Sequence, residues 1–548
     1  MRIELFPATI TLLALTAAAR ADVRYVDARL AGGANDGTSW ASAYRGAGGL
    51  QAALAAAQPD DEIWVAQGTY LPSLTGDRAA SFVLQSRVAL FGGFAGGETQ
   101  LAQRNPSMHV AVLDGDLAGD DGLGGLGDNS LHVVSAGTAG LRGILDGFTV
   151  RGGNAADGGG FLSVVGNPTI RNCILRDNRA SGSGGGAFVD GLGGARFLNC
   201  RFEHNTALRG GGAEVRGGNG VVFEQCVFLA NTATGNQAGG ALFVSSTPTA
   251  LRNCTVTGNM ATGGSIAGVN GGGFTTIVNS IVAGNLGSTI NQDAYMVSAS
   301  WSCIRWGPSG PGVISADPLF LDAAAGDVRL SPVSPCIDAG SNAEVPAALA
   351  SDLAGALRFV EQAGMPDTGA GTAPLVDLGA YEVQPSFQIP FCAGDGSVLA
   401  CPCGNFGFAT RGCDNSSAGT PGALLTGIGT TVPDLVSLHA TGLVPGPAGI
   451  LLQSQTNGAG TLFGDGILCV SGSLTRLYTH PVSASVQVLP DPAAGDPPIS
   501  VRSAALGDPI PPGQIRYYQL YYRDLAAGFC AAPTGATWNL TNGLILHW

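Results

Sequence analysis

Short apolar segments recur at a regular interval through the middle of the chain. Between residues 145 and 285 they are rich in β-branched side chains and are separated by polar or glycine-rich turns. Equivalent cysteines, Cys173, Cys200, Cys226 and Cys254, set the interval at 27, 26 and 28 residues. None of these units holds an apolar stretch with the length and period of a helix. A fixed period with several short strands in each unit predicts a β-solenoid.

Three markers repeat with the strands: an Asn-Cys or Gln-Cys pair, a later asparagine, and a glycine step. Because successive coils of a parallel solenoid stack about 4.8 Å apart, equivalent positions share one environment. We therefore predict inward-facing apolar rows, asparagines in turns that tolerate positive φ, and glycines at corners. One inward row comprises Ile170, Val222, Leu251 and Ile277, and the later asparagines are Asn154, Asn178, Asn205, Asn231, Asn259 and Asn285.

The cysteine row allows three interpretations. Stacking in register places neighbouring Cβ atoms about 4.8 Å apart, beyond the roughly 3.5–4.5 Å of a disulfide. A straight row of sulfur atoms also does not surround a tetrahedral zinc ion. We favour thiols packed as small apolar side chains. One or two strained disulfides, and metal or redox chemistry, are the alternatives.

The first 21 residues have the features of a secretory signal peptide. Arg2 precedes an apolar run from Leu5 to Ala19, and Ala19-Arg20-Ala21 matches a small-x-small cleavage site. No later apolar run approaches the roughly 20 residues that span a bilayer. We expect a protein that is exported by the Sec route and is secreted or held at the cell surface without a membrane span.

The remaining chain divides into a cap, a solenoid and a second module. We assign residues 22–61 to an N-terminal cap and residues 62–383 to a right-handed parallel β-helix of about ten coils. Residues 384–548 lack the period but keep alternating strands. The expected fold class is therefore all-β, with a capped β-helix followed by a smaller β-rich domain, for which we expect a β-sandwich.

The second module carries six cysteines, which predict up to three disulfides in an exported protein. Their spacing leaves fifteen connectivities open, and a zinc site around Cys401 and Cys403 is the alternative. The six are Cys392, Cys401, Cys403, Cys413, Cys469 and Cys530.

Charge narrows the classes of partner. The net charge is −14, which disfavours nucleic acid and anionic membranes as partners. All 26 basic residues are arginine, so a lysine Schiff base or lysine general base is excluded. We expect a monomer.

Several segments resemble known β-helix proteins. NDGTSWASAY (35–44), EIWVAQGTY (62–70) and LDGFTVRGGNA (145–155) resemble secreted bacterial proteins of the pectate-lyase-like type. ADPLF (316–320), SPCIDAG (334–340) and DLGAYE (377–382) resemble the closing segment of "choice-of-anchor" β-helix proteins. The resemblance implies a helix over residues 50–54 that plugs the first coil. It also implies carboxylate-based lyase or glycosidase chemistry for some members.

Two clusters are candidates for chemistry. Asp177, Glu203 and His204 are the best catalytic constellation on the repeats, although solvated coil faces are the favoured interpretation. The loop LDGDLAGDDGLGGLGDN (113–129) supplies hard oxygen ligands on a glycine-rich backbone, as Ca²⁺ prefers. A solvated insertion is again the plainer interpretation, and no cofactor is certain. The candidate Ca²⁺ ligands are Asp114, Asp116, Asp120 and Asp121, with Asp128 nearby.

The combined pattern favours a non-catalytic exported protein that presents a surface to polysaccharide or to the cell surface. A polysaccharide lyase or glycoside hydrolase is the first alternative. A passive surface or matrix protein is the second.

Overall fold

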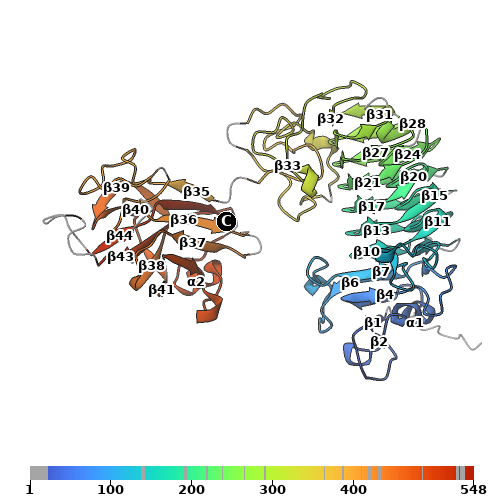
Figure 1. Cartoon of the computed structure of the whole chain (residues 1–548), viewed down its shortest axis with the longest axis horizontal. Coiled ribbons are helices and arrows are strands. Elements are labelled where there is room, and N and C mark those ends of the chain that lie inside the picture. Colours follow the sequence, from blue (N-terminus) through green and yellow to red (C-terminus); the bar gives the residue numbers. More distant parts are fainter. Residues whose placement is uncertain are drawn as a thin grey trace, which may run out of the picture. The chain divides into compact units, whose positions relative to one another are not determined.

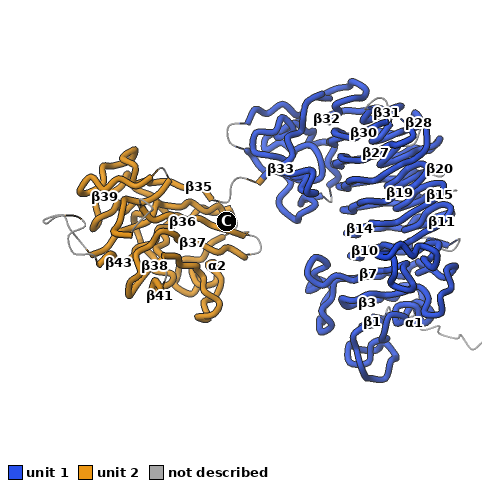
Figure 2. The backbone as a smooth tube through the Cα atoms, viewed as in Figure 1, with its two compact units in different colours: residues 1–383 blue, residues 384–548 orange. Residues whose placement is uncertain are grey.

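The computed structural model forms two compact units, Met1–Val383 and Gln384–Trp548 (Figure 2). The predicted signal peptide, residues 1–21, lies outside the described residues. The described residues are 22–548 without 138–141, 191–193, 218–219, 237–238, 265, 289–291, 348, 363–364, 385–387, 409, 418–421, 430, 432–433, 484, 512, 526–529 and 531–536.

The first unit begins with a cap. β1 (Val23–Asp27) pairs in parallel with β3 (Glu62–Ala66), and α1 (Gly49–Ala56) lies between them in the chain (Figure 1). Leu50, Ala53 and Leu54 of α1 are buried in the same apolar core as the coils. The helix covers a first coil whose edge would otherwise be open to other strands. The predicted cap is confirmed.

Three sheets run along the stack of coils, and their strands pair in parallel (Figure 1). The 9-stranded sheet holds β4 (Gly68–Tyr70), β7 (Ala111–Asp114), β10 (Phe148–Arg151), β14 (Ile174–Arg176), β18 (Arg201–Glu203), β22 (Val227–Leu229), β26 (Thr255–Thr257), β29 (Ile281–Val282) and β32 (Cys303–Ile304). The 6-stranded sheet holds β11 (Asn154–Asp157), β15 (Arg179–Ser183), β19 (Thr206–Ala207), β23 (Thr232–Ala233), β27 (Met260–Ala261) and β30 (Leu286–Gly287).

The largest sheet has 17 strands, usually two from each coil. Besides β1 and β3 it holds β2 (Tyr44–Arg45), β5 (Phe82–Leu84), β6 (Ala89–Phe94), β8 (Val134–Ala136), β9 (Ile144–Asp146), β12 (Phe161–Ser163), β13 (Thr169–Arg171), β16 (Ala187–Asp190), β17 (Arg196–Leu198), β20 (Ala213–Arg216), β21 (Val221–Glu224), β24 (Leu242–Ser245), β25 (Thr249–Arg252), β28 (Ile266–Val278) and β31 (Gln292–Ser300). The β-helix is confirmed. It makes about eight turns over residues 62–295, not ten through residue 383.

The inward rows follow the strand register. One prediction was off by one residue: Val222 pairs with Arg196, whereas its neighbour Phe223 occupies the inward row. Phe197 and Phe223 stack there with ring centroids 5.0 Å apart. The full row is Ile170, Phe197, Phe223, Leu251 and Ile277, all with no exposed surface.

The cysteines of the repeat are packed thiols. Cys173, Cys200, Cys226 and Cys254 are buried and unpaired. The Cys226 amide donates to Cys254 Sγ at 3.4 Å, so neighbouring rungs contact each other directly. Burial above all raises the pKa of the Cys173 and Cys226 thiols, which keeps them neutral and unreactive. The structure thus supports packed thiols over disulfides.

A row of buried asparagines crosses the coils at the turns that follow the strands of the 9-stranded sheet. The Asn205 Nδ2 donates to the Leu175 carbonyl at 2.8 Å and to Asn231 Oδ1 at 2.9 Å, and Asn231 Oδ1 also accepts the Asn205 amide. This pattern repeats from coil to coil, and each member is at most 1% exposed. The ladder comprises Asn178, Asn205, Asn231, Asn259 and Asn285.

The ladder corrects the prediction that these asparagines adopt positive φ. The preceding residue makes the left-handed turn instead, for example Asp177 at 55° and His204 at 54°. The residue before each cysteine of the row does adopt positive φ, as at Asn172 with 53° and Gln225 with 54°. Glycines provide the predicted corners, for example Gly184 at 62° and Gly210 at 58°.

A closing segment, residues 305–383, follows the last coil. It carries β33 (Phe320–Asp322), antiparallel to β34 (Asp327–Leu330), and otherwise has few regular elements. Its Val328 and Ala380 pack on Val227 and Leu229, which lie on the outer face of the 9-stranded sheet. Residues 305–383 therefore cover part of a coil face instead of forming further coils. The number of turns is for this reason smaller than predicted.

The second unit consists of antiparallel sheets. The 6-stranded sheet holds β35 (Gln388–Phe391), β45 (Gly543–His547), β43 (Ile515–Arg523), β38 (Gly446–Ser454), β41 (Thr475–Val482) and β44 (Trp538–Leu540). The 3-stranded sheet holds β36 (Leu424–Ile428), β37 (Ser437–Thr441) and β42 (Val486–Leu489), whereas β39 (Thr456–Phe463) pairs with β40 (Gly466–Ser471). α2 (Ile499–Ala505) packs against β41. Leu425 and Leu438 share a buried core with Leu451 and Leu520, so the two larger sheets pack face to face.

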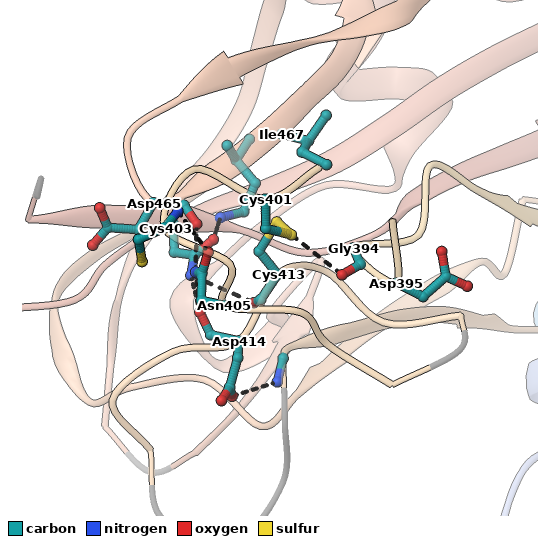
Figure 3. Close-up of a disulfide and its surroundings, with 12 residues drawn as sticks. Gly394, Asp395, Cys401, Cys403, Asn405, Cys413, Asp414, Asp465 and Ile467 are labelled. Atoms are coloured by element: carbon teal, nitrogen blue, oxygen red, sulfur yellow. Dashed lines mark hydrogen bonds between the residues drawn. A yellow bond between two sulfur atoms is a disulfide. The ribbon is translucent and has the colours of Figure 1, made fainter. Parts of the chain in front are cut away.

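Three disulfides join the six cysteines of this unit: Cys392–Cys469, Cys401–Cys413 and Cys403–Cys530. The predicted framework is confirmed, and these thiols are not available to zinc. Beside the Cys401–Cys413 bridge, Asn405 Nδ2 donates to the carbonyls of Asp414 and Asp465, both at 2.9 Å (Figure 3). None of the helices in the described ranges is long and apolar enough to cross a membrane.

Asp293 ends the asparagine ladder and makes it sensitive to pH. Its Oδ1 accepts the amide and Nδ2 of Asn285, both at 2.9 Å. Its buried Oδ2 has no hydrogen-bond partner among the described residues. Burial raises the pKa of Asp293, so the folded state retains the proton to higher pH than the unfolded chain. Asp293 thus stabilises the fold at pH values below its pKa in the unfolded chain. This stabilisation is lost as the pH rises through its pKa in the folded state.

We expect Asp293→Asn to become progressively more stable than the wild type as pH rises from 4 to 8. The gain should be about 1.4 kcal/mol for each unit by which folding raises the pKa. Urea unfolding at several pH values measures it, with the exposed turn variant Asp177→Asn as control. A difference that does not change with pH would contradict this account.

Candidate functional site

An acidic loop, residues 115–133, joins β7 to β8. The Asp116 carboxylate organises it by accepting the backbone N–H groups of Gly119, Asp120 and Asp121 at 2.7, 3.1 and 3.1 Å. Successive amides that converge on one carboxylate hold such a turn closed. The local sequence thereby gathers its own aspartates.

Three carboxylates of this loop meet. Asp116, Asp120 and Asp128 each place one oxygen within 4.8 Å of the others. Asp114 lies outside this group, because Arg151 Nη2 binds its Oδ2 at 2.7 Å. Of the candidate ligands, Asp116 and Asp120 are therefore brought together, Asp128 joins them, and Asp114 is neutralised by arginine.

Buried oxygens beside this group lack partners. Oδ1 of Asp120, Asp121 and Asn129 has no hydrogen-bond partner in the described structure. The Asn129 side chain is buried, and its Nδ2 donates to Asp121 Oδ2 at 3.2 Å. Burial and then the neighbouring carboxylates raise the pKa of Asp120, and burial does most to raise that of Asp121. Unsatisfied oxygens around clustered carboxylates can hold a hard cation such as Ca²⁺.

The catalytic candidates occupy structural positions. Asp177 and His204 are exposed turn residues that precede ladder asparagines. Glu203 forms an ion pair with Arg201, whose Nη1 donates to Tyr381 Oη of the closing segment at 2.5 Å. Glu203 thus pairs with the arginine that bonds the closing segment to the coils.

Arginines pair with carboxylates from one coil to the next. Arg171 Nε lies 2.6 Å from Asp146 Oδ2, and Arg216 Nη2 lies 2.9 Å from Asp190 Oδ2. These ion pairs link adjacent coils. Further pairs between coils are Arg196–Glu224 and Arg252–Glu224. Arg209 and Glu214 pair within one coil at 3.5 Å, and burial raises the pKa of Glu214.

An aromatic groove at the last coil was missed by sequence reasoning. It has a volume of about 490 Å³ and is lined by uncharged residues. Tyr295, Met296 and Trp306 are 44, 51 and 55% exposed. The Trp306 carbonyl accepts the amides of Asp293 and Ala294 at 2.9 and 3.1 Å, which fixes one wall to β31. The full lining is Gln292, Ala294, Tyr295, Met296, Trp306, Gly307 and Pro308.

Two sequence signals point towards this groove. Tyr295 and Met296 lie in an alternating strand at the end of the repeat, where further coils no longer cover them. Trp306 follows only two residues after the last coil strand, β32. Neither signal by itself predicts that the side chains meet.

Comparisons with known proteins concern the coils. A family model for the right handed beta helix region matches residues 131–287. No curated protein matches the chain. A crystal structure of pectate lyase Pel9A is 15% identical, with a TM-score of 0.31, and covers 67% of this chain and 97% of its own. The pectin methylesterase from Aspergillus niger is 13% identical, with a TM-score of 0.25, and covers 54% and 84% respectively. The two structural likenesses do not bear on function.

Proposed function

Since the first unit contains a right-handed parallel β-helix, we propose that it serves as an exported scaffold that binds polysaccharide in the aromatic groove at its last coil. The exposed wall of Tyr295, Met296 and Trp306 is the observation that carries this proposal. Binding, rather than catalysis, is the proposed role of the β-helix.

The groove has the chemistry that a sugar chain requires. Pyranose rings present apolar C–H faces that stack on aromatic side chains, while their hydroxyl edges need hydrogen bonds. The volume of about 490 Å³ lies within the roughly 300–1,000 Å³ typical of ligand pockets. Trp and Tyr combine a large apolar face with a polar atom at low entropic cost. The Gln292 amide supplies a hydrogen-bonding group beside them.

The charge distribution favours a neutral glycan. The lining formed by the described residues holds no charged side chain, and the protein carries a net charge of −14. A polyuronate would meet long-range repulsion without a compensating cation in the groove. Export is supported by the three disulfides and by the predicted signal peptide.

We also propose a structural role for the acidic loop, in which Asp116, Asp120 and Asp128 bind Ca²⁺. The unpartnered oxygens of Asp120 and Asp121 support it, because buried charges without partners are unfavourable. The ion would fix an insertion on the coils and take no part in the groove.

We expect Trp306→Ala to weaken binding to neutral polysaccharides at least about tenfold, because truncation of an aromatic anchor typically costs 2 kcal/mol or more. Affinity electrophoresis against a panel of neutral glucans, mannans, xylans and polyuronates measures it. Phe408→Ala is the control, since this phenylalanine is 64% exposed but lies in the second unit.

Equal binding by Trp306→Ala and wild type would contradict the groove assignment. Absence of binding across the panel would favour a passive matrix role. Release of unsaturated uronates, followed by ultraviolet absorption, would favour the lyase alternative, and release of reducing ends would favour a glycoside hydrolase.

We expect Ca²⁺ to protect the acidic loop from proteolysis in the wild type and not in Asp120→Asn. Limited proteolysis of chelator-treated protein, with cuts between residues 117 and 127 mapped by mass spectrometry, measures the effect. Asp177→Asn serves as the matched loss of one carboxylate and should be protected like the wild type. Equal cutting with and without Ca²⁺ in the wild type would overturn the assignment.

A further inference from the structure

A second acidic group lies in the closing segment, around the motif SPCIDAG. Asp338 is held by its backbone: its amide donates to Asp377 Oδ1 at 2.8 Å, and its carbonyl accepts the amides of Thr368 and Gly369 at 3.1 and 3.0 Å. Its φ of 50° is in the left-handed region. Ile337 and Ala339 on either side are buried. The position of Asp338 is therefore fixed from several directions.

The Asp338 carboxylate is buried without compensation. The residue has no exposed surface, and neither carboxylate oxygen has a well-formed hydrogen bond among the described residues. Burial is the largest influence on its pKa, which it raises, and the backbone amide of Gln362 lowers it. The nearby buried cation, Arg358, is committed to Gln225 Oε1 at 2.8 Å and to Glu382 at 3.7 Å. A buried charge without a partner is strongly unfavourable, so the Asp338 carboxylate requires either a proton or a cation.

Two further carboxylates approach Asp338 instead of a cation. Glu361 and Asp367 each place an oxygen within 4.8 Å of it and of one another. Burial, followed by the charges of Glu361 and Asp367, raises the pKa of Asp338 to about 6. Gln362 adds a buried Oε1 that also lacks a partner among the described residues.

We propose that Asp338, Glu361 and Asp367 form a second Ca²⁺ site, separate from the acidic loop. Two oxygens bound at about 2.4 Å on opposite sides of one ion lie about 4.8 Å apart, which matches the observed grouping. The donors are all hard oxygens, so zinc and copper are disfavoured. Glu361 and Asp367 are exposed, which leaves room for the water ligands that complete a coordination number of six to eight.

The ion would fasten the closing segment. Asp338 belongs to the part that reaches the coils, because Asn279 Nδ2 donates to the Ser341 carbonyl at 2.9 Å and Asn279 Oδ1 accepts its amide at 2.8 Å. Glu361 and Asp367 belong to a separate loop of the segment. A shared ion would link the part that holds Asp338 to the loop that holds Glu361 and Asp367. It would also neutralise the buried charge of Asp338.

The test uses the mature chain carrying Asp116→Asn and Asp128→Asn, so that the acidic loop contributes no Ca²⁺ binding. Calorimetric titration with Ca²⁺ should show one site in this background. Glu361→Gln and Asp367→Asn should each weaken it at least about tenfold, because each removes one of three charged ligands. Glu344→Gln, an exposed acid of the same segment, should leave the affinity unchanged.

Thermal unfolding of Asp338→Asn separates a metal site from a purely structural carboxylate. In chelator this variant should be at least as stable as its background, since it removes a buried unpaired charge. In Ca²⁺ it should gain nothing, whereas the background should rise. The site is refuted if no heat of binding is detected, if Glu361→Gln and Asp367→Asn bind like Glu344→Gln, or if Ca²⁺ raises the unfolding temperature of Asp338→Asn as much as that of its background.

Discussion

The asparagine ladder is the interaction on which the coil architecture depends. In a stack of short parallel strands, each coil must find hydrogen-bond partners in its two neighbours, and the turns between strands leave buried amides and carbonyls unpaired. The side chains of Asn178 to Asn285 satisfy these groups, since each donates to a carbonyl of the preceding coil, and each from Asn205 onward accepts from the preceding asparagine of the row. A coil shifted by one residue would lose these bonds and expose its inward row. The thiol row and the stacked phenylalanines follow the same register.

The regular coils position the irregular parts, and the irregular parts carry the chemistry. Carboxylates on the coils are largely held by arginines of adjacent coils, as at Asp146 and Asp190. The acidic loop is an insertion between β7 and β8, the groove forms where the ladder ends at Asp293, and Asp338 lies beyond the last coil. In each case, polar or aromatic groups gather where the repeat is interrupted. A scaffold of this kind keeps its binding chemistry at insertions and ends.

Repetition explains how much could be predicted from the sequence. Because equivalent residues recur, the cysteine row and the glycine corners could be placed without a structure, whereas the cap helix was expected from the resemblance to known β-helix proteins. Errors arose where a shift of one residue along a strand reverses the direction of the side chain. Val222 and Phe223 are both apolar, and only the strand pairing shows that Phe223 faces inward. The asparagines were assigned to turns, because their bonds to neighbouring coils depend on tertiary contacts. The groove forms over residues 292–308, where the repeat ends, and the Asp338 group belongs to the closing segment, so the repeat pattern did not show which of their side chains meet.

The most direct measurement of the ladder's role is the response of neighbouring coils to Asn231→Ala. This change leaves the Phe202 carbonyl and the Asn205 amide without their partners, and each unsatisfied buried group costs about 1–3 kcal/mol. The account predicts a loss of at least about 2 kcal/mol in the free energy of unfolding. Hydrogen exchange should become faster in peptides spanning residues 202–206 and 255–260, on both sides of the substitution. A loss no larger than that of Thr232→Ala, the neighbouring partly exposed side chain, with exchange unchanged in both peptides, would contradict it.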